Sequence, residues 1–371
     1  MIIRPSRFAL LAALPLLATA ACGDREPDRP ETQATSPATD EASRLRQSIE
    51  SANYTPPASD EDSQSGSNGS SDSDSEDGAS ADRGGAVEGE LEDAEAEPAM
   101  VRAQILLDRT RFSPGIIDGL GGENTRQAIA AFQEANDLEV TGELNAAVFE
   151  QLTSGDSDRV LTDYAITEDD VAGPFIGEVP ESMEAMGELE TVGYADAREA
   201  LAEKFHMSPD LLDALNPGVD FSRAGQSIVV AATGSSGLDG EVARIEVNKD
   251  EKSVRAFNAD GDLLAFYPAT IGSRETPSPS GTHTVRAIAP EPNYTYDPEQ
   301  GGGGKIIVPP GPNNPVGSVW IDLSRDGYGI HGIPDPALIG KTASSGCVRL
   351  TNWDAEQLAG AVEQGVEVEF V

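Results

Sequence analysis

The sequence predicts a multidomain α+β protein in which small helical units precede a mainly β domain at the C-terminus. Three changes of pattern along the 371 residues support this division. Apolar residues recur at helical spacing after residue 99, and a second short helical unit follows after residue 160. Apolar and polar residues then alternate after residue 241. The stretch before residue 99 shows neither pattern, so we expect it to lie outside the folded domains.

Residues 1–21 have the pattern of a secretory signal peptide. Arginines precede an apolar run at residues 8–20, which is too short for a membrane-spanning helix. Small residues before Cys22 make this segment similar to a lipoprotein signal, which implies that Cys22 carries a lipid anchor. Ordinary cleavage near Ala21, giving a soluble exported protein, stays open. Because Gly23 stands where an inner-membrane retention signal would have Asp, we expect a periplasmic protein anchored at the outer membrane.

Residues 22–98 form an acidic segment that we predict to be a disordered linker. The segment is rich in Ser, Gly, Asp and Glu, and it has too few aliphatic side chains to offset the entropy lost on ordering. The whole chain has a formal net charge of −40, which repels nucleic acid and anionic lipid headgroups. We therefore expect no nucleic-acid partner, and we expect membrane contact only through the lipid at Cys22.

Residues 99–154 predict a small bundle of three helices. Their apolar residues recur at helical spacing, and a Pro114–Gly115 turn and a glycine cluster at 119–122 separate the first two helices. The stretch "FSPGIIDGLGGENTRQAIAAFQ" resembles the three-helix peptidoglycan-binding domain family. That resemblance, and not the periodicity, implies that this unit binds the cell wall.

Residues 160–233 predict a second small unit with two helices and a final strand. We expect a helix at 197–205, a second helix after the N-cap Ser208, and a strand at 227–230. The segment "LNPG" followed by "AGQSIVV" makes the unit similar to a LysM-type glycan-binding module, with its first strand expected around "ELETVGY". His206 lies within this unit, and we expect it to be a structural or surface histidine.

Residues 241–371 predict a mainly β domain with one helix. The stretch "ARIEVNKDEKSVRAFNADGDLLAFYPATIG" alternates apolar and polar residues over two runs joined by an Asp-Gly turn. Further strands are expected in "GTHTVRAIA", "KIIVPP", "SVWIDLS" and "VEVEFV". The helix is expected in "TNWDAEQLAGAVEQG", capped by Thr351 or Asn352.

Cys347 is the cysteine that stays unpaired if Cys22 is lipidated. Exported proteins pair their thiols or avoid them, so a lone thiol is either a buried apolar group or a nucleophile. A nucleophilic thiol needs a base. Of the three histidines, His331 is the best placed, sixteen positions earlier at a strand-to-loop junction. His206 belongs to another unit, and His283 is expected to be a strand residue in or near the cleft.

Two neighbours of Cys347 favour the nucleophile. Gly346 permits close backbone approach and helps to free N–H groups for an oxyanion hole. Arg349 lies two positions after Cys347, so it shares a strand face with the thiol and can hold a substrate carboxylate through two hydrogen bonds.

The stretch "YGIHGIPDPALIGKTASSGCVRL" resembles the active-site signature of the L,D-transpeptidase (YkuD-type) family. Two further stretches, "TPSPSGTHTV" and "PPGPNNPVGSVWIDL", are similar to neighbouring motifs of that family. The resemblance implies Cys347 as nucleophile, His331 as base and the Gly332 carbonyl as the group that orients the imidazole. It also implies an oxyanion pocket and a peptide contact formed by Ser344, Ser345, Gly346 and Arg349. Many family members have His where this chain has Ser345.

The reaction implied by the resemblance is acyl transfer on peptidoglycan stem peptides. A thioester forms on the third residue of a tetrapeptide with release of D-Ala, and an amine of another stem then resolves it to a 3→3 cross-link. No metal or cofactor is expected, and we expect a monomer. Three alternatives stay open at this point: a carboxypeptidase that uses water, a ligase that joins a protein to the wall, and a peptidoglycan anchor without catalytic activity.

Overall fold

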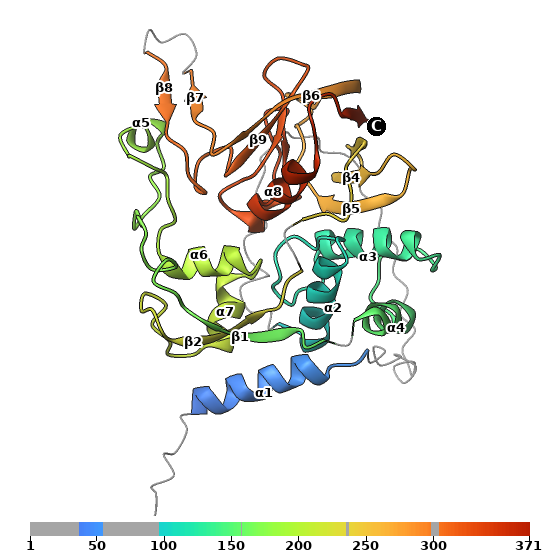
Figure 1. Ribbon diagram of the computed structural model, residues 1–371, viewed down its shortest axis with the longest axis vertical. Helices are drawn as coiled ribbons and strands as arrows, with labels where there is room; N and C mark the ends of the chain where they lie inside the picture. The colour runs from blue at the N-terminus through green and yellow to red at the C-terminus, as the bar shows by residue number, and fades with distance from the viewer. Residues whose placement is uncertain (1–36, 55–95, 157, 235–236, 298–303) are drawn as a thin grey trace, which may run out of the picture. The chain divides into compact units, whose positions relative to one another are not determined.

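The computed structural model describes residues 37–54, 96–156, 158–234, 237–297 and 304–371 (Figure 1). All of these residues belong to one compact unit, Pro37–Val371. The predicted signal peptide at 1–21, the predicted lipid anchor at Cys22 and most of the predicted linker lie outside the described residues. Within the ranges that are described, no helix has both the length and the apolar character needed to span a bilayer.

The first helical unit contains the three expected helices. Helix α2 has Pro98 in its first turn, where the N–H that proline lacks has no helical partner. The Asn145 side chain caps α4 by accepting the Val148 N–H at 3.0 Å. The bounds are α2 (Pro98–Arg109), α3 (Glu123–Ala135) and α4 (Ala146–Gly155). The buried faces contain the apolar residues that the helical spacing singled out, among them Val101, Ile105, Leu106, Ala128, Ile129, Phe132, Val148 and Leu152.

The second unit has the order strand, one-turn helix, two longer helices, strand. Ser208 caps the second long helix as expected, because its side chain accepts the Leu211 N–H at 3.1 Å. The two strands at its ends pair antiparallel, with Leu161 opposite Ala231. The elements are β1 (Leu161–Ala165), the one-turn helix α5 (Met183–Met186), α6 (Ala197–Lys204), α7 (Pro209–Leu215) and β2 (Ser227–Ala231).

The prediction of a strand around "ELETVGY", residues 188–194, is wrong. Residues 161–165 form the first strand instead, and the segment at 188–194 runs along the C-terminal domain. There the Val192 N–H donates to the Pro310 carbonyl, and the Asn313 N–H donates to the Val192 carbonyl, each at 3.0 Å. The segment was misassigned because its backbone groups find their partners in a distant stretch of sequence, which local pattern cannot reveal.

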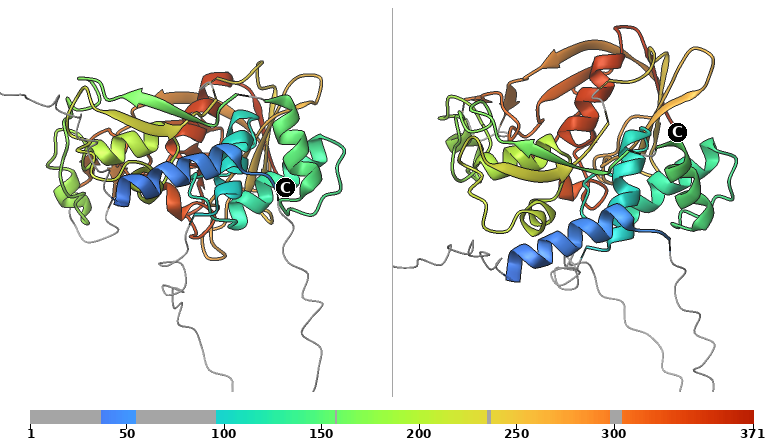
Figure 2. Two further views of the ribbon diagram at one scale, coloured as in Figure 1. Left: turned by 90° about the horizontal axis from the view of Figure 1, so that it is seen from below. Right: turned by 60° about the horizontal axis from the view of Figure 1, so that its bottom comes forward.

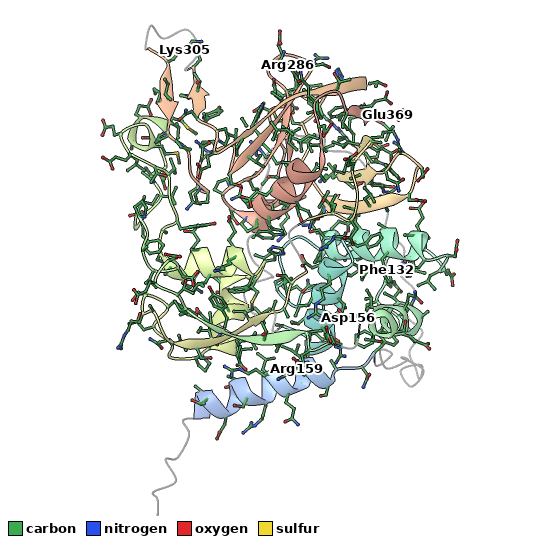
Figure 3. All side chains as sticks on the ribbon, viewed as in Figure 1. Phe132, Asp156, Arg159, Arg286, Lys305 and Glu369 are labelled. Carbon is green, nitrogen blue, oxygen red and sulfur yellow. The ribbon has the colours of Figure 1, made fainter. Side chains whose placement is uncertain are left out.

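Helix α1 (Pro37–Ser51) occupies part of the predicted linker, so the prediction of disorder is wrong for these residues. Its apolar stripe Ala42, Leu45 and Ile49 packs into the core of the helical units. The Arg46 Nε atom donates to the last carbonyl of α7 at 3.0 Å. Figure 2 shows α1 passing across α2 and the second unit. Figure 3 labels Arg159 beside this helix, where its Nε atom lies 3.5 Å from Glu50.

The C-terminal domain is built on an eight-stranded sheet with the order β11-β10-β9-β6-β12-β3-β4-β5. The pairs β3–β12 and β10–β11 are parallel, and the other neighbouring strands are antiparallel. The strand bounds are β3 (Arg244–Asn248), β4 (Ser253–Phe257), β5 (Leu263–Pro268), β6 (Gly281–Pro290), β9 (Val319–Leu323), β10 (Gly329–His331), β11 (Val348–Arg349) and β12 (Glu367–Phe370). A separate hairpin comprises β7 (Tyr294–Tyr296) and β8 (Ile306–Val308).

One helix, α8 (Asn352–Ala361), packs on this sheet beside β9 and β10 (Figure 1). Thr351 is its N-cap, because the threonine side chain accepts the Asp354 N–H at 3.1 Å. Leu358 and Ala355 are buried against the sheet. The first alternating stretch contains three strands where two runs were expected, since a second turn at residues 249–252 separates β3 from β4.

The helical units attach to the sheet through strand β5. The Ser113 N–H donates to the Phe266 carbonyl and the Phe266 N–H donates to the Arg111 carbonyl, each at 2.9 Å. These bonds satisfy the outer edge of the sheet, which would otherwise expose unpaired backbone groups. The Phe266 side chain enters the apolar core of the helical units, while the sheet and α8 enclose a second core.

Candidate active site

Strands β10 and β11 bring the two predicted catalytic residues together. They run parallel, with Ile330 opposite Val348 and His331 opposite Arg349. Cys347 directly precedes β11, so the sixteen-residue loop returns the thiol to the strand that carries the histidine. The parallel pairing of β10 with β11 therefore brings two residues that are sixteen positions apart in sequence onto neighbouring strands.

His331 is fixed in a buried position. Its side chain is 3% exposed, and its Nδ1 atom lies 2.7 Å from the Gly332 carbonyl oxygen. The Trp320 ring stacks on the imidazole with centroids 5.2 Å apart. Burial lowers the pKa of His331 to about 4, and the positive charge of Arg349 acts in the same direction, while the carbonyls of Gly332 and Val316 oppose the shift. The imidazole is therefore neutral at pH 7 and able to accept a proton.

Cys347 is a half-buried free thiol. Burial raises its pKa, although the Gly329 N–H and the Arg349 charge oppose this effect. In the described part of the chain the Cys347 Sγ atom contacts the Gly327 carbonyl, at 3.7 Å. Thiol and imidazole are thus both neutral in the resting site. The proton must move from sulfur to a base as the substrate arrives, because the thiolate is the nucleophile.

The loop before Cys347 is held by its own side chains. The buried Ser344 hydroxyl donates to the Cys347 carbonyl at 2.5 Å and accepts the Gly346 N–H at 3.0 Å. The Gly346 N–H is therefore occupied, and Ser344 and Gly346 shape the loop that carries the thiol. Ser345 is exposed on this loop. An oxyanion hole at this loop therefore has to use an N–H group other than that of Gly346.

Ser278, from the stretch "TPSPSG", supports the same loop from outside. Its buried hydroxyl donates to the Gly346 carbonyl and accepts the Gly272 N–H, each at 2.9 Å. Thr276 of the same stretch donates to the Ser344 carbonyl at 3.1 Å. The sequence alone does not indicate this role of Ser278, because a serine among turn residues has no local feature that identifies a distant hydrogen-bond partner.

Arg349 lies beside the two catalytic candidates. Its backbone pairs with Thr270, through the Thr270 N–H to the Arg349 carbonyl at 2.9 Å and the return bond at 2.8 Å. Its side chain is half-buried, and the Nε atom has no hydrogen-bond partner within the described ranges. A half-buried guanidinium whose Nε–H has no partner is suited to a substrate carboxylate.

The other two histidines lie away from this site. His283 is on β6, opposite Val368, and its ring packs edge-on against Phe370 at 5.7 Å. His206 follows α6, and its Nδ1 atom lies 2.9 Å from the Asp108 carboxylate. Its ring stacks on Trp353 at a centroid distance of 4.8 Å. His206 therefore connects both helical units to α8.

Among the described residues, a free thiol and a buried, neutral imidazole lie on or beside adjacent strands of a mainly β domain, and this arrangement fits a cysteine-dependent acyltransferase. The family model described as "L,D-transpeptidase catalytic domain" matches residues 242–369, and the model described as "Putative peptidoglycan binding domain" matches residues 96–152. The chain belongs to the YkuD family of L,D-transpeptidases.

Two curated relatives match over most of their own length. "Putative L,D-transpeptidase YkuD" of Bacillus licheniformis is 31% identical over 172 residues, which cover 46% of this chain and 90% of the relative. The protein of the same name from Bacillus subtilis is 30% identical over 181 residues, covering 48% of this chain and 94% of the relative.

Solved structures of L,D-transpeptidases match at lower similarity. An L,D-transpeptidase from Mycobacterium smegmatis is 21% identical with a TM-score of 0.29, covering 40% of this chain and 63% of that one. L,D-transpeptidase 3 from Mycobacterium tuberculosis, solved with a faropenem-derived adduct, is 19% identical with a TM-score of 0.29, covering 39% and 63%. The chain thus spans less than two thirds of the length of these structures.

Proposed function

We propose that this L,D-transpeptidase acts on peptidoglycan stem peptides through a thioester on Cys347, with His331 as the base. The observation that carries the proposal is the 2.7 Å contact between His331 Nδ1 and the Gly332 carbonyl, one strand away from the thiol. A carbonyl can only accept, so the neutral ring carries its proton on Nδ1. Nε2 then remains free to take the thiol proton.

The proposed reaction has two acyl-transfer steps. As His331 takes the thiol proton, sulfur attacks the carbonyl carbon of the third stem residue, which we infer to be meso-diaminopimelate. The peptide C–N bond breaks, and the imidazolium returns the proton to the departing amine of D-Ala. A side-chain amine of a second stem then attacks the thioester and its proton passes through His331. A 3→3 cross-link forms and the Cys347 thiol is restored.

Substrate contacts are assigned to the surroundings of the thiol. Arg349 would bind a stem carboxylate, since its Nε atom is buried and unpaired within the described ranges. The loop of Ser344, Ser345 and Gly346 would line the pocket of the tetrahedral intermediate. Because the Gly346 amide donates to Ser344, we assign the oxyanion contact to another main-chain N–H of the loop, that of Cys347.

The acceptor distinguishes this function from its alternatives. Water in place of the amine would make the protein a carboxypeptidase, and an amine of another protein would make it a ligase. A thioester transfers to a bound amine in preference to water when the site positions that amine. The peptidoglycan-binding match at residues 96–152 favours an acceptor held within the wall.

The test is conversion of a defined disaccharide-tetrapeptide by the full chain, with products separated by mass. We expect 3→3 dimers and free D-Ala from the wild type. We expect a loss of about 10³-fold or more with Cys347→Ala, which removes the nucleophile. Undiminished conversion by Cys347→Ala would overturn the proposal. Tripeptide without dimer would identify the carboxypeptidase. A carbapenem adduct on Cys347 supports the enzyme, whereas no adduct and no turnover of stems would favour an anchor.

Two adjoining units are assigned to wall binding. Residues 99–154 would bind peptidoglycan, and residues 160–233 would act as a LysM-like glycan-binding module. The antiparallel pairing of β1 with β2 around α6 and α7 supports the second assignment. Binding of the full chain to insoluble peptidoglycan, compared with a chain that lacks residues 96–156, tests the contribution of the first unit.

Export and anchoring complete the proposal. We place the protein in the periplasm, since its substrate is peptidoglycan, and we assign a lipid on Cys22 as the anchor in the outer membrane. The test compares the wild type with Cys22→Ser in membrane fractions. The wild type is expected in the outer-membrane fraction and the variant in the soluble one. Equal distribution would show that the lipid is absent or dispensable.

A further inference from the structure

Asn352 lies at a junction of three segments near the catalytic histidine. It is the first residue of α8, and its side chain is 1% exposed. Its Oδ1 atom accepts the Ser318 N–H at 3.1 Å. Its Nδ2 atom donates to the Pro312 carbonyl at 3.2 Å and to the Glu203 carboxylate at 3.0 Å. All hydrogen-bonding atoms of the amide are therefore engaged.

The same side chain fixes the backbone that holds His331. A Cβ atom built at Gly332 would lie 2.1 Å from Asn352 Oδ1, and a Cβ atom built at Gly317 would lie at the same distance. The amide oxygen thus occupies the space that both glycines leave open. The two carbonyls that face the imidazole belong to Gly332 and to Val316, which precedes Gly317. Asn352 therefore touches both segments that determine where the imidazole sits.

The support for Asn352 comes from outside the catalytic domain. Glu203 lies in the last turn of α6, in the unit of residues 160–233. Its Oε1 atom accepts from Asn352 Nδ2 and also from the Tyr194 hydroxyl, at 2.8 Å. The amide of Asn352 is thereby oriented with its NH₂ group toward α6 and its oxygen toward Gly332.

We propose that Asn352 is a positioning residue for His331 and that Glu203 holds it in place, so that helix α6 forms part of the support of the active site. This inference rests on the proposed roles of Cys347 and His331. The unit of residues 160–233 would then have a second function beside the proposed glycan binding. Displacement of α6 would release Asn352 and loosen the backbone around His331.

The test is a double-mutant cycle in the full chain. Burial raises the pKa of Glu203 to about 7, so the cycle is measured at pH 8, where Glu203 is ionised. There Asn352→Asp points a carboxylate oxygen at the Glu203 carboxylate, and we expect kcat to fall about 10- to 100-fold with little change in KM, because a misplaced base costs rate and not binding. Glu203→Gln alone keeps an acceptor for Asn352, and we expect a loss of about threefold or less. In the double variant, the amide introduced by Glu203→Gln can donate to the carboxylate introduced by Asn352→Asp. We therefore expect about tenfold recovery relative to Asn352→Asp.

The pH dependence separates positioning from general destabilisation. Loosening the backbone admits water to His331, so the midpoint of the acid limb of kcat/KM should rise toward the ordinary histidine value. The rate at which iodoacetamide alkylates Cys347 should show the same change, and this readout needs no peptidoglycan. Glu203→Ala provides a second variant if Asn352→Asp fails to fold, and it should move the acid limb in the same direction.

Asn313→Asp is the matched control. Asn313 also donates to a glutamate of α6, since its Nδ2 atom lies 3.0 Å from Glu199, but none of the described glycines near His331 packs against it. We expect loss of thermal stability with an unmoved acid limb. The inference is overturned if Asn352→Asp behaves like this control, or if the double variant is no more active than Asn352→Asp. Unchanged conversion by Cys347→Ala would instead overturn the proposed function.

Discussion

The Nδ1 atom of His331 lies 2.7 Å from the carbonyl oxygen of Gly332, the next residue in the chain. This contact sets the tautomer of the neutral ring, because the carbonyl cannot donate. The burial that surrounds the contact keeps the ring neutral. A single local arrangement therefore supplies both requirements of a base, an unprotonated nitrogen and a fixed orientation.

The first prediction concerns the pH dependence of activity. Because burial lowers the pKa of His331 to about 4, the base stays unprotonated from neutral pH down to about pH 5. We expect kcat/KM for tetrapeptide conversion to stay level over that range and to fall below about pH 4. Initial rates between pH 3.5 and 8, with circular dichroism to confirm folding, measure this. A midpoint near 6.5 would mean that the imidazole is solvated.

The second prediction concerns Gly346, whose φ of +115° favours glycine. A Cβ atom there would lie 2.8 Å from Cε1 of Tyr328, so Gly346→Ala should displace the thiol and lower kcat by about 100-fold. Gly365→Ala is the matched control, since Gly365 has a φ of +97° and nothing within 4 Å of its built Cβ atom. That variant should lose about 1 kcal/mol or more of stability and keep its kcat. Equal kcat values for the two variants would contradict the prediction.

The third prediction concerns Ser278. Ser278→Ala leaves the Gly272 N–H and the Gly346 carbonyl without their bond to the hydroxyl, which should cost about 1–3 kcal/mol of stability. Since Gly346 adjoins Cys347, the proposed nucleophile, we also expect kcat to fall about tenfold. Ser280→Ala, two positions on and exposed, is the control and should change neither quantity appreciably. Chemical denaturation measures the stability, and single-turnover acylation measures the rate. If Ser280→Ala lost as much stability and rate as Ser278→Ala, Ser278 would have no specific role.

The local chemistry of the site could be predicted from the sequence, whereas its supporting contacts could not. A cysteine in the C-terminal domain, a histidine at a strand end and a glycine beside the thiol are visible as residue types, and the family signature joins them. The roles of three other residues cannot be recognised from their residue type: Ser278, Asn352 and Glu203. They act through partners that lie many residues away in sequence, and only the strand order and the packing of α8 bring those partners together.

In the fold, too, the elements set by local sequence pattern could be predicted, whereas those set by distant contacts could not. Helices α2, α3 and α4 and strands β3 and β9 follow from apolar periodicity, because each buries one face. Strand β10 is buried along its whole length and β11 has two residues, so neither shows a period. Helix α1 was missed because it lies in an acidic, low-complexity stretch, and its short apolar stripe is stabilised by contacts with α2 and α7. The misassigned strand at 188–194 was apolar enough to pair, but its partner is the segment at 310–313.

The fourth prediction concerns His206, where both helical units meet α8. Burial lowers the pKa of His206, but the nearby Asp108 carboxylate, with smaller contributions from Asp354 and Glu203, raises the pKa above its ordinary value. A histidine with a raised folded-state pKa stabilises the fold below its unfolded pKa of about 6.5 and loses that contribution as pH rises through the folded value. His206→Asn removes the ion pair while keeping a residue that tolerates the φ of +56° found here.

We therefore expect His206→Asn to cost about 3 kcal/mol of stability at pH 6, the scale for breaking a buried pair, and progressively less toward pH 9.5. Thermal denaturation of both proteins across this range measures the difference. Arg198→Ala breaks the half-exposed pair between Arg198 and Asp213 and serves as control, with an expected cost of about 1 kcal/mol or less at every pH. A His206→Asn deficit that stays constant from pH 6 to 9.5 would mean that stacking on Trp353, and not the charge on the imidazole, carries the effect.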